Sequence, residues 1–141
     1  MGKLKIVGVA TLASFVVACG FMDRGAPAHL APSEFFSPAM RDELRGATVV
    51  TFGFLDSEMG TFVLRGANED LSGPVPNERY PFPLLNEAGI RACLADYYGF
   101  YVSIEVDSFG RAGQEKVTSV VVREPMVAGE MPAVALCLPT E

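Results

Sequence analysis

The chain has 141 residues, 50% of them hydrophobic, and a formal net charge of −6 at pH 7. This length fits one ordinary domain, and the apolar content is sufficient for a real core. The 17 acidic residues outnumber the 11 lysines and arginines, so the surface repels nucleic acid and anionic lipid head groups, and neither is an expected ligand.

The N-terminal residues have the pattern of a secretory signal. Lys3 and Lys5 form a short basic start, residues 6–18 follow without a charge, and small residues stand near Cys19. The uncharged run is shorter than the roughly 20 apolar residues that a membrane-spanning helix needs. The sequence therefore predicts export. An uncleaved membrane anchor is the alternative.

Residues 16–19 (Val-Val-Ala-Cys) resemble the lipobox of bacterial lipoproteins. The resemblance implies that residues 1–18 are a signal peptide and that Cys19 becomes the first residue of the mature chain, attached to the membrane by acyl groups such as palmitate. Gly20 follows the cysteine where inner-membrane lipoproteins more often have aspartate. In a diderm host this implies the outer membrane, facing the periplasm. An ordinary signal peptide that happens to contain a cysteine is the alternative.

Residues 19–40 are predicted to be a flexible tether, and residues 41–141 a β-rich globular domain. The tether holds several prolines and alanines and has no periodicity long enough for a helix or a strand. Phe35 and Phe36 are exceptions. We expect them to pack on the edge of the domain, because large apolar side chains usually find cover.

A hairpin is predicted at the start of the domain. Residues 47–55 (ATVVTFGFL) are rich in β-branched and aromatic side chains, a turn follows at 56–60, and residues 61–65 form the return strand. Residues 66–83 contain many prolines and glycines and are predicted to be a loop. Asn86 caps a short predicted helix that extends to about residue 97.

Three further strands are predicted after this helix. Residues 100–107 (FYVSIEVD) alternate apolar and polar side chains, which is typical of a strand with one buried face. A turn at 108–114 leads to a strand over 116–123, and residues 133–138 (AVALCL) form the last strand.

The order of hairpin, irregular stretch, short helix and second hairpin resembles small Greek-key barrels of the OB type, in which a helix plugs the barrel. The resemblance covers residues 43–124 and rests on order and spacing. It implies a mainly β fold with one short helix, arranged as a small antiparallel barrel. A two-sheet sandwich is the alternative.

Cys93 and Cys137 remain as a pair if Cys19 carries lipid, and an oxidising compartment then favours a disulfide between them. It would close a loop of about 45 residues, for which loop entropy gives roughly 4 kcal/mol of stabilisation. Two buried free thiols are the alternative.

Catalytic motifs are absent from the sequence. His29 is the only histidine and lies in the predicted tether, which disfavours Ser-His or Cys-His catalysis and a metal centre. Glu105 and Asp107 share a strand face, and Asp56 and Glu58 flank a turn, so either pair of carboxylates could serve a hydrolase of envelope polymers. Acids on an exposed strand are more often simply solvated.

Residues 68–70 (Asn-Glu-Asp) offer oxygen ligands to calcium without the register of an EF-hand, so no metal and no cofactor are expected. Tyr80 and Tyr101 are the candidate binding surface, because exposed aromatics bind sugars and peptides on small barrels. Tyr97 and Tyr98 are expected to complete the packing of the helix.

The sequence thus predicts a lipid-anchored protein of the cell envelope with a non-enzymatic binding or scaffold role. Its expected partners are the membrane, through Cys19, and an envelope protein or glycan. The alternatives are a hydrolase that uses surface carboxylates and a subunit of an envelope assembly that docks through a sheet edge.

Overall fold

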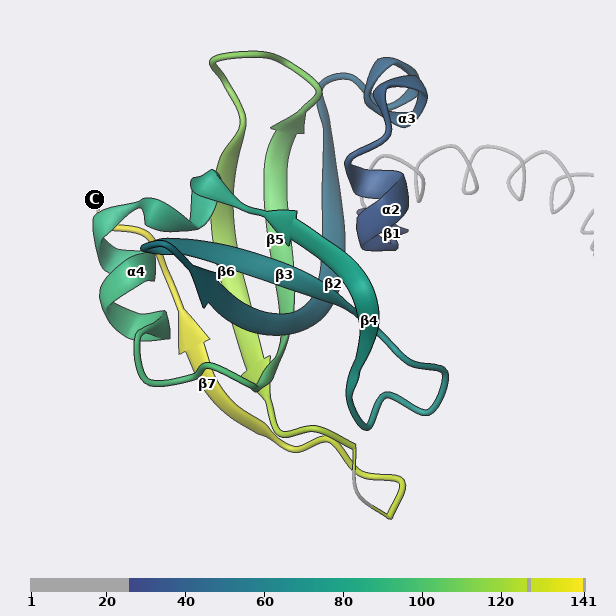
Figure 1. The fold of residues 1–141 in the computed structure, drawn as a ribbon. Coiled ribbons are helices and arrows are strands. Elements are labelled where there is room, and N and C mark those ends of the chain that lie inside the picture. Colours follow the sequence, from purple (N-terminus) through teal and green to yellow (C-terminus); the bar gives the residue numbers. More distant parts are fainter. Residues whose placement is uncertain (1–25, 127, 141) are drawn as a thin grey trace, which may run out of the picture.

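The computed structural model describes residues 26–126 and 128–140, which form one strongly curved sheet with short helices around it (Figure 1). The seven-stranded sheet has the order β4-β3-β2-β5-β6-β7, and β1 pairs with β2 outside this path. All pairings are antiparallel except the parallel one between β1 and β2. The end strands β4 and β7 do not pair with each other, so the sheet is curved like a barrel wall but not closed.

The strands are β1 (Ala28–Leu30), β2 (Ala47–Glu58), β3 (Thr61–Ala67), β4 (Pro74–Pro81), β5 (Tyr101–Phe109), β6 (Lys116–Arg123) and β7 (Ala133–Cys137). The helices are α2 (Pro32–Phe35), α3 (Pro38–Glu43) and α4 (Ala88–Leu94), with a 3₁₀ turn η1 (Pro83–Asn86) before α4. The predicted mainly β class is confirmed, and the described residues contain three short α-helices where one was predicted. None of the helices in the described ranges is long and apolar enough to cross a membrane.

The predicted first hairpin is confirmed, and its strands are longer than expected. Met59 and Gly60 alone form the turn, both with positive φ (53° and 81°), which matches the twist of the flanking strands. Further back, Gly53 allows β3 to approach the middle of β2. A Cβ at this position would lie 2.4 Å from the carbonyl oxygen of Arg65, so only glycine fits here.

The core lies on the concave side of the sheet, where the predicted alternation holds. Val102, Ile104 and Val106 of β5 are fully buried, as are two valines of β6. Ile90 and Leu94 of α4 join the same cluster, so the helix covers one end of the core. Among the predicted strands, β6 and β7 agree with the sequence to within one residue.

The predicted tether is wrong over residues 28–40, which fold onto the sheet. β1 extends the sheet beside β2, and α2 buries Phe35 to 1% exposure. The Phe35 ring stacks on Phe82 at 5.2 Å and packs on Phe109 at 4.9 Å, while Phe36 contacts both Phe35 and Phe82. The two phenylalanines are therefore part of the core and its rim. Residues 19–25 lie outside the described residues.

Two further expectations are corrected between β3 and β5. The predicted loop over 66–83 contains β4, whose prolines are tolerated because the strand lies at the edge of the sheet. The helix is shorter than predicted, and Glu87 rather than Asn86 is its N-cap. The Glu87 carboxylate accepts a 2.9 Å hydrogen bond from the backbone N–H of Ile90.

Candidate functional site

A cleft of about 690 Å³ lies beside the first half of β6, a volume typical of ligand sites. It exists because β6 and β7 pair only over part of their length: the register joins residues 120–123 of β6 to β7 and stops there. Continued, this register would place Pro139 opposite Thr118. Proline has no N–H to donate, and the chain leaves β6 at this point.

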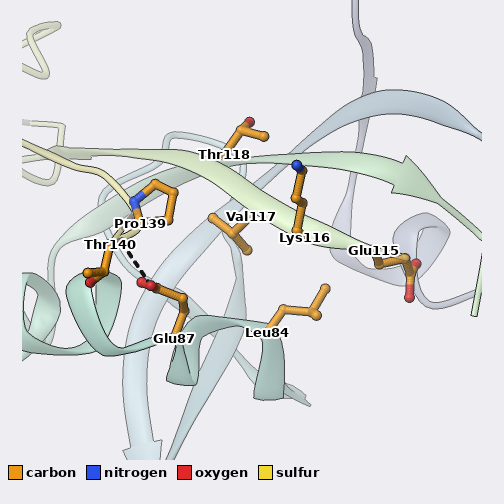
Figure 2. Close-up of a pocket in the computed structure, with 8 residues that line it drawn as sticks. All are labelled: Leu84, Glu87, Glu115, Lys116, Val117, Thr118, Pro139 and Thr140. Atoms are coloured by element: carbon orange, nitrogen blue, oxygen red, sulfur yellow. Dashed lines mark hydrogen bonds between the residues drawn. The ribbon is translucent and has the colours of Figure 1, made fainter. Parts of the chain in front are cut away.

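The departing C-terminal segment lies against α4 instead. A Cβ on Gly89 would be 2.8 Å from the backbone nitrogen of Thr140 and 3.0 Å from the carbonyl oxygen of Leu138, so glycine is required for this close approach. The Thr140 N–H donates a 2.8 Å hydrogen bond to Glu87 (Figure 2). The cleft is thus bounded by β6 on one side and by η1, α4 and the C-terminal segment on the other.

A disulfide at Cys137, the residue before this C-terminal segment, also holds the segment next to α4. The sulfur atoms of Cys93 in α4 and Cys137 in β7 lie 2.00 Å apart, with 5.7 Å between the Cα atoms, so the predicted pairing is present. Cys137 is 1% exposed and belongs to the core. The bond therefore ties the end of β7 to the helix beside the cleft.

Apolar and polar side chains line opposite sides of the open edge. In Figure 2, Val117 points from β6 toward the space that Leu84 enters from η1, whereas Lys116 and Thr118 point to the other side of the strand. Pro139 adds a further apolar surface at the C-terminal end. This alternation is the period-two pattern of a strand.

The two acidic groups at the cleft are already engaged inside the fold. The Glu115 carboxylate forms an ion pair with Arg41 of α3 and accepts the Gly110 N–H at 3.0 Å. Arg41 lies over the Phe109 ring at 5.0 Å, which fixes the guanidinium from a second side. Glu115 therefore stabilises the turn between β5 and β6.

Glu87 has an equivalent structural role at the other end of the cleft. Its two oxygens accept backbone N–H groups of Ile90 and Thr140. The bond from Ile90 is the main cause that lowers the pKa of Glu87 below its usual value of 4.5. The group is thus held as a carboxylate at neutral pH, which does not suit a general acid.

Lys116 is the remaining charged group that lines the cleft. Its side chain is exposed and forms no ion pair with any described residue. The cleft therefore combines a free cation, an apolar wall and an unpaired strand edge. This combination can hold an extended chain with acidic groups.

The two tyrosines of the predicted binding surface lie on opposite faces of the sheet. Tyr80 of β4 is paired with core-facing Leu64 and stacks on Phe36 at 5.2 Å, with the rings nearly parallel. Tyr101 of β5 lies opposite Phe54 on the outer face, with ring centroids 5.4 Å apart. The structure therefore does not bring them together into one surface.

Burial also limits what Tyr101 can contribute. The residue is 6% exposed, and desolvation raises the pKa of its phenol. Tyr97 packs edge-on against Phe100 and against the core cluster, as expected. Tyr98 is 47% exposed and stacks on Phe62 of β3, so it does not complete the packing of the helix.

The carboxylate pairs considered for hydrolysis all have ordinary partners. Glu105 accepts the Thr118 hydroxyl at 2.6 Å, and Asp107 accepts the Thr48 hydroxyl at 3.1 Å. The acids at the first hairpin pair with arginines of β3 and β4: Asp56 with Arg65 and Glu58 with Arg79. These contacts give each acid a partner within the fold.

The loop over 68–70 also uses its oxygens internally. The Asn68 side chain accepts the N–H groups of Ser72 and Gly73, and Asp70 accepts the Ser72 hydroxyl at 2.7 Å. The Ser72 hydroxyl is the main cause that lowers the pKa of Asp70. In the part of the chain that the structure describes, no group of three His, Cys, Asp or Glu side chains is placed to hold a metal.

Comparisons with protein-family models, with curated proteins and with solved structures find no match to this chain. The site itself must therefore carry the functional argument. Cys19, the predicted lipidation site, lies outside the described residues. Sequence reasoning missed the cleft, and Pro139 after the last predicted strand was the one available signal for it.

Proposed function

We propose that this chain is a lipid-anchored protein of the cell envelope whose folded domain has a non-enzymatic binding or scaffold role. The observation that carries the binding role is the cleft at the open edge of β6. Its acidic groups are committed to the fold, and its strand edge and one lysine are free. Such a site has groups for recognition and lacks an available acid–base pair.

The proposed location in the cell envelope rests on the N-terminal signal and on Cys19, whose lipobox-like sequence context supports acylation. One acyl chain gives only marginal and reversible membrane binding, whereas several chains on one cysteine hold firmly, since each buried methylene adds about 0.8 kcal/mol. In a diderm host, Gly20 favours the outer membrane with the domain in the periplasm. The Cys93–Cys137 disulfide fits the oxidising side of the membrane.

The organisation of the chain also suits a tethered receptor. The domain begins near residue 28, so the segment from Cys19 to residue 27 spans at most about 3.3–3.6 Å per residue. A tether of this length keeps the domain close to the bilayer. The cover that α4 provides over one end of the curved sheet supports a resemblance to OB-type barrels, although the sheet edges remain open.

The anchor is tested by Cys19→Ala in cells of the native host, with Cys93→Ala/Cys137→Ala as the matched control that keeps Cys19. We expect the Cys19 variant to remain unprocessed or to leave the membrane fraction. The intact mass of the unaltered protein should equal residues 19–141 plus acyl groups.

The control variant should still be acylated, since Cys93 and Cys137 have no part in the signal. Unchanged processing and membrane attachment of the Cys19 variant would overturn the anchor. The binding role is tested separately: a wild-type hydrolytic activity on envelope polymers that disappears in Glu105→Gln/Asp107→Asn would replace it with the enzymatic alternative.

A further inference from the structure

We infer that the cleft beside β6 binds an extended peptide segment of a protein partner, which adds to the sheet as an extra strand along residues 116–119 and presents acidic side chains to Lys116. This inference deepens the proposed binding role and rests on it. It states where the ligand binds, that the ligand is extended, and that the ligand carries acidic side chains.

The strand edge supplies the first argument. β5 pairs with β6 from Lys116 to Arg123, but β7 covers only residues 120–123 on the opposite side. On that side, residues 116–119 have no strand partner within the described ranges. Unpaired backbone groups of a strand edge are a template for another chain, and peptide addition satisfies them with main-chain hydrogen bonds.

The fold itself keeps this edge open. Pro139 cannot donate to the ladder, and the C-terminal segment is held on α4 by the Glu87–Thr140 hydrogen bond and by close packing on Gly89. The disulfide between Cys93 and Cys137 limits any return of this segment toward β6. An added strand therefore takes the place that a longer β7 would otherwise fill.

The side chains at the edge define the sequence pattern of the ligand. Leu84 offers an apolar contact on one side of the strand, where Val117 is already 4% exposed (Figure 2). Lys116 offers a cation on the other side, where the Thr118 hydroxyl donates to Glu105. An added strand presents alternate side chains to these two sides. The site therefore fits a peptide that alternates aliphatic and acidic residues.

Charge decides between an acidic and a basic peptide. Glu115 is neutralised by Arg41, and the Glu87 oxygens are satisfied by two backbone N–H donors. Lys116 forms no ion pair among the described residues: Asp107, which lies opposite it in the β5–β6 ladder, accepts the Thr48 hydroxyl. Lys116 is therefore the cation that an incoming ligand can meet. A free backbone edge favours a peptide over a glycan, because a sugar does not extend a β-ladder.

The test uses the full chain purified in detergent and two fluorescein-labelled heptapeptides, Ser-Val-Asp-Val-Asp-Val-Ser and its analogue with lysine in place of both aspartates. We expect saturable binding of the acidic peptide in fluorescence anisotropy and weak binding of the basic one. Lys116→Glu should weaken the acidic peptide roughly fivefold and strengthen the basic one. Arg91→Glu makes the same change of net charge at an exposed residue outside the cleft lining and should change neither affinity by more than about twofold.

Hydrogen exchange identifies the binding mode. Strand addition should slow exchange of the amides of residues 116–119, and an acidic peptide N-methylated at its central valine should lose binding because it cannot complete the ladder. No binding of the acidic peptide, equal effects of Lys116→Glu and Arg91→Glu, or protection confined to other strands would overturn the inference.

Two other occupants are also outcomes of this test. Protection of residues 116–119 that grows with protein concentration without peptide would identify a second copy of the chain. Protection of residues 116–119 by a chitin oligosaccharide, with no binding of either peptide, would identify a glycan. Either result would overturn the peptide site. The intact mass of the same preparation reports acylation of Cys19, so failure of the peptide site and failure of the anchor remain distinguishable.

Discussion

Reduction of the Cys93–Cys137 disulfide should destabilise the domain by an amount that the structure defines. The bond joins residues 44 positions apart, and closing a loop of that length in the unfolded chain is worth about 4 kcal/mol. Domains of this size are stable by only about 5–15 kcal/mol in total. Loss of the bond should therefore remove a large share of the stability without abolishing the fold.

The assay is urea unfolding of the full chain in detergent, followed by far-ultraviolet circular dichroism with and without reductant. With an m value near 2 kcal/mol per M, the midpoint should fall by about 2 M on reduction. The matched control is Cys93→Ala/Cys137→Ala, whose midpoint should not respond to reductant.

Hydrogen exchange shows which part of the domain is destabilised by reduction. Hydrogen exchange in the reduced protein should rise first in β7 and in residues 138–140, because the disulfide ties this segment to α4. A loss below about 1 kcal/mol on reduction would refute the argument from loop closure. Reaction of both cysteines with a thiol reagent in the unreduced, folded protein would refute the bond itself.

Three further substitutions test the fold and its pH dependence. Phe35→Ala should cost about 3–5 kcal/mol in urea unfolding, because it leaves a cavity among stacked rings in the core. Gly53→Ala should cost roughly 1–3 kcal/mol and lower the melting temperature, since its Cβ would overlap the carbonyl oxygen of Arg65. Glu87→Gln should flatten the acid limb of stability against pH: the Ile90 N–H lowers the pKa of the folded state, so this group stabilises the fold above its unfolded pKa near 4.5, and the contribution is lost as pH falls through the folded pKa.

Each of these expectations has a contrary result. A loss under about 1 kcal/mol for Phe35→Ala would mean that α2 is not part of the cooperative core. An unchanged melting temperature for Gly53→Ala would show that β3 can retreat from β2 without cost. A Glu87→Gln variant with the same acid limb as the unaltered protein would remove Glu87 from the groups that govern acid unfolding.

The sequence determined the strands whose side chains alternate. In residues 102–106 the apolar positions recur every second residue, and this local period indicates both the strand and its buried face. Residues 116–123 were predicted as a strand because they are rich in β-branched side chains. The first hairpin was predicted for a similar reason, since turn residues separate two β-rich runs. The disulfide was predicted from the number of cysteines and from the predicted export of the protein, and both can be read from the sequence.

The elements that the sequence missed depend on distant contacts. Nothing local distinguishes residues 28–40 from a tether, and their structure comes from Phe35 entering a space between Phe82 and Phe109. β4 contains three prolines in eight residues and has a strand partner on one side only, so only its position at the sheet edge makes it a strand. In the same way, Tyr80 and Tyr101 looked equivalent in sequence, but the sheet places them on opposite faces.

The sequence by itself therefore determined the mainly β class, the two central strands, the cysteine pair and the predicted envelope address. Only the tertiary structure decided where the sheet stays open. The edge of β6 is free because the C-terminal segment gains contacts with Glu87 and Gly89 that replace the ladder Pro139 cannot continue. The C-terminal segment could contact either α4 or β6, and both sets of contacts are non-local. A local pattern of residues does not indicate which set is more stable.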